Sequence, residues 1–158
     1  MAGTLAPATY QVTATVMVDA NDVLTIPAGT RLRFGTGTAL NVAGTLLAEG
    51  QPDHQITLTS LAATPAPGNW TGIQFTGSPA TASLLDHAEI SFAQNGIDVL
   101  SEGTRVLVRN SMIVSNSQNG VKVDLADGMQ IYDGQVVIEG CSLAYNQNGV
   151  YLGAYVWE

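Results

Sequence analysis

The sequence predicts an all-β solenoid, in which short strands stack in parallel along one axis. One turn occurs three times, as QNGIDV at 94–99, QNGVKV at 118–123 and QNGVYL at 147–152. The glycines of these turns, together with Gly72 in NWTGIQF, follow one another at intervals of 24, 24 and 29 residues. Such a period is typical of a solenoid. The flanking segments alternate apolar and polar residues, which indicates half-buried strands.

The residues before each turn also align from one repeat to the next. One inward position is occupied by Leu85, Val108 and Ile138, a second by Ile90, Ile113 and Leu143, and the position before the shared turn by Asn116 and Asn146. Each inward residue is expected to stack on its counterpart one coil away, where full burial contributes roughly 1.5–3 kcal/mol.

The N-terminal half follows the same scheme less regularly. Its inward positions are expected to be the pairs Leu24/Ile26, Leu32/Phe34, Leu40/Val42, Leu46/Ala48 and Ile56/Leu58. The glycine turns at 27–30 and 42–45 separate them. Leu32 and Ile56 lie 24 residues apart, which is again one coil. The irregular segment LAATPAPGN at 61–69 is predicted to be an inserted, proline-rich loop.

Two folds would account for an Asn-Gly turn that repeats. In a β-sandwich, each Asn-Gly would form a type I′ hairpin. This reading explains the turn but neither its period nor the repeated flanks. In a solenoid, asparagine at a repeated turn tolerates a positive φ, and its side-chain amide can bond the amides above and below. The solenoid is therefore favoured.

Composition excludes several classes of protein. The chain has 158 residues and a formal net charge of −8, with only 5 basic residues. This argues against binding to nucleic acid, which requires clustered Lys and Arg. No apolar run approaches the roughly 20 residues that span a bilayer, so no membrane insertion is expected.

The single cysteine, Cys141, excludes an internal disulfide framework. The start lacks a signal peptide, as in a cytoplasmic protein or a mature segment behind an added Met.

Several segments carry a family resemblance. The run DVLTIPAGTRLRF, then ALNVAGTLLAEG, QITLTS and GNWTGIQF, resembles the opening of right-handed parallel β-helix repeat proteins of the pectate-lyase-like superfamily. The QNG repeats are similar to the coils that follow in it, so the resemblance runs from Tyr10 to Leu152. It implies a single-stranded right-handed parallel β-helix of about six coils of ~22–29 residues. It also implies one domain over 1–158, complete or part of a longer secreted protein, at the cell surface or outside the cell.

Two outward columns are candidates for function. The first consists of Gln74, Asp98, Lys122 and Tyr151, which parallel stacking would place about 4.8 Å apart. Asp98 and Lys122 are expected to form a surface ion pair. A polar column that ends in an aromatic ring would also line a shallow groove for sugar. The second column, Asp86, Arg109 and Glu139, alternates in charge and is expected to hold the coils in register.

The longer third repeat contains a candidate metal site. Its extra residues lie in DLADGMQIYDG at 124–134, where Asp124, Asp127 and Asp133 would offer the oxygen ligands that calcium prefers. The spacing is not that of an EF-hand, and Asp and Gly are ordinary loop residues. We expect no cofactor, with calcium as the alternative.

Other conspicuous side chains are expected to be structural. His54 and His87 are assigned to the surface or to turns, Cys141 to a packed position, and Trp70 to the core. The tail after Tyr151 is apolar and aromatic. We expect 155–157 to fold across the open end of the solenoid, or the open end to recruit a second copy and form an end-to-end homo-oligomer.

Two classes of function follow. The first is a non-catalytic module that serves as a rigid scaffold for adhesion or carbohydrate contact, with a polysaccharide or surface glycan as partner. The alternative, which the resemblance implies, is a polysaccharide lyase or glycoside hydrolase. Lyases need a base and a stabiliser of the developing charge, and hydrolases need paired carboxylates. The sequence contains no cluster that matches either. Ice binding through outward threonines such as Thr57 and Thr59 lacks a regular threonine column across coils.

Overall fold

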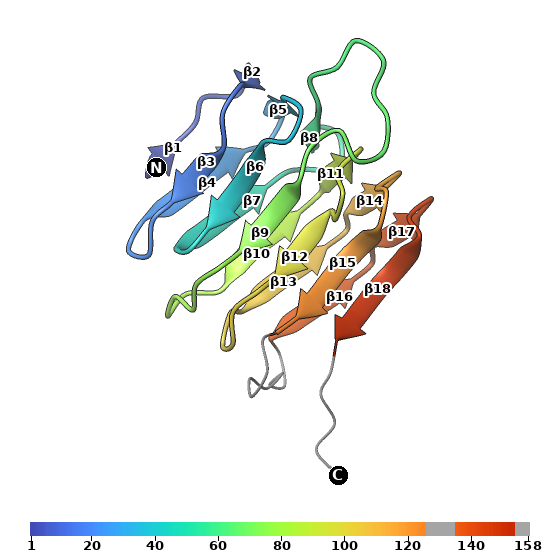
Figure 1. Cartoon of the computed structure of the whole chain (residues 1–158). Coiled ribbons are helices and arrows are strands. Elements are labelled where there is room, and N and C mark those ends of the chain that lie inside the picture. The colour runs from blue at the N-terminus through green and yellow to red at the C-terminus, as the bar shows by residue number, and fades with distance from the viewer. Residues whose placement is uncertain (126–134, 154–158) are drawn as a thin grey trace.

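The chain forms a single-stranded, right-handed parallel β-helix, seen in a computed structural model that describes residues 1–125 and 135–153 (Figure 1). Three parallel sheets of six strands each run along its axis, and every coil contributes one strand to each sheet. The predicted solenoid of about six coils is therefore confirmed. No described residue belongs to a helix that could cross a membrane.

The three sheets are named A, B and C in the order in which each coil visits them. Sheet A contains β1 (Gly3–Thr4), β4 (Val23–Pro27), β7 (Thr45–Glu49), β10 (Ser83–Asp86), β13 (Val106–Arg109) and β16 (Val136–Glu139). Sheet B contains β2 (Thr9–Val12), β5 (Arg31–Phe34), β8 (Ile56–Ser60), β11 (Ala88–Ser91), β14 (Met112–Val114) and β17 (Ser142–Ala144). Sheet C contains β3 (Val16–Val18), β6 (Ala39–Val42), β9 (Gly72–Phe75), β12 (Ile97–Val99), β15 (Asn119–Asp124) and β18 (Asn148–Gly153).

The core consists of inward side chains stacked from coil to coil. The two predicted stacks are confirmed: Leu85 and Ile138 both pair with Val108, and Ile90 and Leu143 both pair with Ile113. One predicted spacing is wrong, because Leu32 aligns with Leu58 and not with Ile56. The connection from β7 to β8 is longer than the connection from β4 to β5, so a fixed spacing of 24 residues misses the true partner by one inward position.

The corners of the coils differ from the prediction. The left-handed backbone lies at His87 and Asn110 between sheets A and B, and at Phe92, Ser115 and Tyr145 between sheets B and C. No positive φ occurs at the asparagines of the QNG turns, so the tolerance of asparagine for that conformation is not used there. The chain has already turned before QNG, and the asparagine there enters the strand of sheet C in an ordinary conformation.

The predicted amide ladder is confirmed at the same asparagines. Asn119 Nδ2 donates to Asn95 Oδ1 at 2.8 Å, and Asn148 Nδ2 donates to Asn119 Oδ1 at 2.9 Å. A second ladder joins Asn116 Nδ2 to Asn146 Oδ1 at 2.9 Å. The repeated Asn therefore bonds successive coils through its side chain, and this explains why the turn occurs three times.

No hairpin forms at Asn119-Gly120, since every strand pairing of the described residues is parallel apart from one isolated bridge between Gln51 and His54.

Trp70 lies in the core as predicted, fully buried, with its ring stacked on Phe34 at a centroid distance of 4.1 Å. The predicted cap at 155–157 lies outside the described residues.

Candidate functional site

The first predicted column exists on the outer face of sheet C. Asp98 pairs in register with Gln74 on one side and with Lys122 on the other, and Lys122 pairs with Tyr151. Asn41 extends the column by one coil, because it pairs with Gln74. The four predicted residues are thus neighbours, and their role in binding stays a prediction.

The predicted binding role requires Asp98 to be exposed, but the residue is buried, with only 6% of its surface accessible. Its Oδ2 accepts a hydrogen bond from Asn95 Nδ2 at 3.3 Å, while its buried Oδ1 has no partner among the described residues. Burial raises the pKa of this carboxyl, an effect that Lys122 and Asn95 reduce and the nearby Asp124 increases. Asp98 therefore ends the amide ladder.

The predicted ion pair between Asp98 and Lys122 is wrong. Lys122 Nζ instead lies 3.0 Å from Asp124 Oδ2, two residues along the same strand face. Asp124 is the more exposed of the two carboxylates, so pairing there avoids the cost of bringing the ammonium further into the protein. Burial lowers the pKa of Lys122, but Asp124, Asp98 and Tyr151 outweigh it, and the pKa is raised overall.

The candidate calcium site is described only in part. Asp124 ends β15, and its carboxylate is engaged with Lys122. Asp127 and Asp133 lie outside the described residues. Across residues 1–125 and 135–153, no three His, Cys, Asp or Glu side chains gather closely enough to hold a metal ion.

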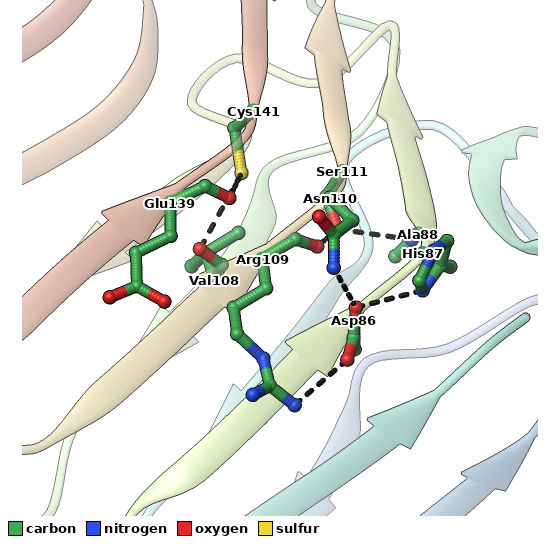
Figure 2. A network of polar contacts seen from close by, with 9 residues as sticks. All are labelled: Asp86, His87, Ala88, Val108, Arg109, Asn110, Ser111, Glu139 and Cys141. Atoms are coloured by element: carbon green, nitrogen blue, oxygen red, sulfur yellow. Dashed lines mark hydrogen bonds and ion pairs between the residues drawn. The ribbon is translucent and has the colours of Figure 1, made fainter. Parts of the chain in front are cut away.

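The second predicted column forms a paired polar network on the outer face of sheet A (Figure 2). Asp86 Oδ2 lies 2.9 Å from Arg109 Nη2, and Asp86 Oδ1 lies 3.0 Å from Asn110 Nδ2 and 2.8 Å from His87 Nδ1. Burial raises the pKa of Asp86, but Asn110, Arg109 and His87 together outweigh burial and lower it. The Asp86–Arg109 contact joins two coils as predicted, whereas Glu139 follows Arg109 in register without an ion pair to it among the described residues.

Cys141 lies beside this network and is packed, as predicted. Its thiol is half-buried against the core, with its sulfur 3.3 Å from the carbonyl oxygen of Glu139 and 3.5 Å from that of Val108 (Figure 2). Ser111, one coil earlier, donates in the same way to Arg109 O at 2.6 Å. Both side chains hold the corner between sheets A and B and indicate no chemistry of their own.

The structure reveals a polar cleft that the sequence did not indicate. It has a volume of about 440 Å³ and lies over the outer face of sheet B, next to the proline-rich loop at 61–69. Its lining comes from β5, β8, β11 and the loop, and comprises Arg31, Arg33, Thr57, Thr59, Ser60, Pro65 and Glu89. In Figure 1 this loop projects from the body of the solenoid between β8 and β9.

Strand register places the side chains of the cleft in rows. Arg31 and Glu89 both pair with Thr57, on either side of it, and Arg33 pairs with Thr59. Because adjacent strands are about 4.8 Å apart, the backbones of Arg31 and Glu89 are separated by roughly 10 Å. A basic end and an acidic end therefore flank two hydroxyl groups.

The wall of the cleft is fixed at both ends of the loop. At its start, Leu61 N donates to Phe34 O at 2.7 Å, and Ala62 N donates to Ser60 Oγ at 3.0 Å. At its end, Asn69 N donates to Phe92 O at 3.0 Å, while its Oδ1 accepts from Ala66 N at 2.8 Å. The cleft is therefore built before any ligand arrives, which lowers the entropy cost of binding.

The charged groups of the cleft have few partners. Among the described residues neither Arg31, Arg33 nor Glu89 forms an ion pair within 4.0 Å. Arg33 Nη2 donates to Leu61 O at 3.2 Å, and Glu89 Oε1 accepts from Ser91 Oγ at 3.3 Å. Both ends of the cleft thus keep hydrogen-bonding capacity for a ligand.

Sequence reasoning missed the cleft because its residues come from three different coils. A signal was present, since RLRF at 31–34 places two of the 5 basic residues of the chain on one face of a strand. Thr57 and Thr59 were recognised as outward, but only the register shows that they follow these arginines.

Fold and site together define a parallel β-helix protein with a polar cleft on one flank. A family model described as the pectate-lyase like beta helix domain matches residues 3–98, more than half of the chain. The chain belongs to this family. Neither the curated proteins nor the solved structures contained a match. The matched range includes β5, β8 and β11, which build the cleft.

Proposed function

We propose that this protein is a non-catalytic β-helix scaffold, at the cell surface or outside the cell, that binds carbohydrate in the cleft over sheet B. The observation that carries the proposal is the cleft itself. It is concave, its lining is mostly polar, and it presents threonine hydroxyls between basic and acidic side chains. Sugar hydroxyls both donate and accept hydrogen bonds, so such a lining suits them.

The alternative, a polysaccharide lyase or hydrolase, has less support. Among the described residues that line the cleft, Glu89 is the one carboxylate, whereas glycoside hydrolysis ordinarily uses two that flank the scissile bond. On sheet C, Asp98 and Asp124 approach each other, but Asp98 is buried and Lys122 is paired with Asp124. In the cleft, Arg31 and the carboxylate of Glu89 stand at opposite ends, roughly 10 Å apart at the backbone, and on sheet C the accessible carboxylate of Asp124 is paired with Lys122.

The test is a binding screen of the purified chain against immobilised polysaccharides, with Thr57→Val and Glu89→Gln as cleft variants. We expect binding that both variants weaken. Gln74→Ala on sheet C is the matched control, and it should bind as the unmodified chain does. A loss confined to Gln74→Ala would move the site to sheet C and contradict the proposal.

Incubation with pectate, alginate and glycosaminoglycans provides the second test. We expect neither ultraviolet-absorbing unsaturated products nor new reducing ends. Release of unsaturated product that is abolished by Lys122→Ala would establish a lyase on sheet C instead.

A further inference from the structure

The basic end of the cleft contains two guanidinium groups side by side. Arg31 and Arg33 are two residues apart on β5, so both project from the same face of sheet B, roughly 7 Å apart at the backbone. Neither forms an ion pair among the described residues. Two like charges held together without a counter-ion repel each other, and an anion placed between them would relieve this repulsion.

We propose that Arg31 and Arg33 form a binding site for a tetrahedral oxyanion, a sulfate or phosphate ester carried by the saccharide. The inference rests on the proposed function of the cleft. The ester would occupy the basic end, and the hydroxyls of the same sugar would reach Thr57 and Glu89.

The number of donors favours a tetrahedral group over a carboxylate. One guanidinium satisfies a planar carboxylate through two parallel hydrogen bonds. Here two guanidiniums lie next to Thr57 and Thr59, and one N–H of Arg33 is already used by Leu61 O. Thr59 Oγ1 pairs with Ser91 Oγ at 3.0 Å, so the donors left for a ligand are those of the two guanidiniums and of Thr57. Their number exceeds what one planar carboxylate can accept and suits an anion with three terminal oxygens.

The acidic end explains why the site would select the orientation of the ligand. Glu89 lies on the far side of Thr57, roughly 10 Å from Arg31 at the backbone, and it repels a second negative group. A singly esterified sugar can therefore place its charge only at the arginine end.

The experiment is isothermal titration calorimetry of the full chain at constant ionic strength. The inorganic probes are sulfate, phosphate and acetate. The saccharide probes are a neutral galactan oligosaccharide, its sulfate ester and its phosphate ester, and the comparison of the two esters identifies the source of the oxyanion. We expect sulfate or phosphate to bind more tightly than acetate, and the matching ester to bind roughly tenfold or more tightly than the neutral sugar.

Arg31→Ala is the decisive variant, because within the described part of the chain it is Arg33, and not Arg31, whose side chain donates to the loop, at Leu61 O. In this variant, the affinity for the ester should fall to about the affinity for the neutral sugar, a ratio of about one. Arg31→Lys should retain part of the preference for the ester, since the positive charge stays but the paired donors of the planar guanidinium are lost. Glu89→Gln should weaken the ester and the neutral sugar alike, because Glu89 contacts sugar hydroxyls, and so should leave the preference for the ester unchanged. Arg105→Ala, an exposed arginine away from the cleft, is the control of equal charge change and should leave the ester advantage intact.

The outcomes separate the two proposals. If the neutral sugar binds but Arg31→Ala leaves the advantage of the ester unchanged, or if acetate equals sulfate, the oxyanion site is overturned and the scaffold function stands. If no saccharide binds but inorganic sulfate or phosphate does so through Arg31, the oxyanion site stands and the carbohydrate function fails. Absence of all binding overturns both.

Discussion

Ile113 shows how a single inward side chain holds neighbouring coils together. It is fully buried and pairs with Ile90 on one side and with Leu143 on the other. A cavity at this position would border both neighbouring coils, and the rigid backbone of three sheets limits how far they can collapse into it.

Ile113→Ala should therefore lower the free energy of unfolding by about 2–5 kcal/mol. Met112→Ala, the adjacent and exposed residue of the same strand, is the control and should have an effect of about 0.5 kcal/mol or less. Urea denaturation of the two variants measures both values. Equal losses would show that the inward and outward faces have been exchanged.

Asp98 and Asp86 are two aspartates whose pKa values are shifted in opposite directions. The pKa of Asp98 is raised, so ionisation favours the unfolded chain as pH rises through the range between the unfolded and folded values. The pKa of Asp86 is lowered, so its contribution to stability is present above the unfolded pKa and lost as pH falls through the folded one.

Asp98→Asn is expected to raise the melting temperature at pH near 7, where it removes a buried charge, and to lose that advantage below the unfolded pKa. Asp86→Asn should do the reverse, lowering the melting temperature near neutral pH and converging with the unmodified chain in acid. Thermal denaturation across pH measures both. A lower melting temperature for Asp98→Asn at neutral pH would contradict the assignment.

At the scale of the strand, glycine in the QNG turn is required by close approach rather than by a special backbone angle. None of the three QNG glycines has a positive φ. A Cβ on Gly96 would meet the Ile113 side chain and would lie 2.7 Å from Gly120 O of the next coil. A Cβ on Gly149 would meet Leu143 only at 3.6 and 3.9 Å, which is ordinary contact.

Gly96→Ala should therefore destabilise the protein by about 1–3 kcal/mol through overpacking. Gly149→Ala should be tolerated, within about 0.5 kcal/mol of the unmodified chain. The same chemical change at two equivalent turns makes the pair its own control. The midpoints of chemical denaturation compare them, and equal destabilisation would mean that the turn itself, not the neighbouring coil, demands glycine.

At the scale of the whole molecule, both ends of the described solenoid expose apolar surface. The first coil leaves an apolar cavity of about 250 Å³, with Leu24 and Phe34 among its lining residues. In the last described coil, the inward residues Val150 and Leu152 are 45% and 60% exposed. The edge strands at both ends run in the same direction, so a second copy would continue all three sheets.

We expect this chain to associate head to tail in a concentration-dependent way. Leu152→Lys places a charge on the contact face and should reduce association, whereas Met112→Lys on the side of the solenoid should not. Light scattering coupled to size-exclusion chromatography measures the mass of each variant. A constant monomer mass for the unmodified chain at every concentration would contradict this expectation.

The sequence by itself determined the solenoid, because its period and its alternation of apolar residues are local patterns that repeat along the chain. Spacing along the sequence aligns the inward residues Leu85, Val108 and Ile138, and it also predicts the asparagine ladder. These features recur coil by coil, so spacing alone predicts their neighbours.

Only the tertiary structure decided which outward side chains are accessible and which are paired. Asp98 was expected at the surface and is buried. Lys122 forms its ion pair with Asp124 and not with Asp98, its neighbour in register. The cleft of Arg31, Thr57 and Glu89 draws on three coils and one loop. Accessibility and charge pairing depend on the geometry of all neighbouring side chains at once, and no single segment of sequence contains that information.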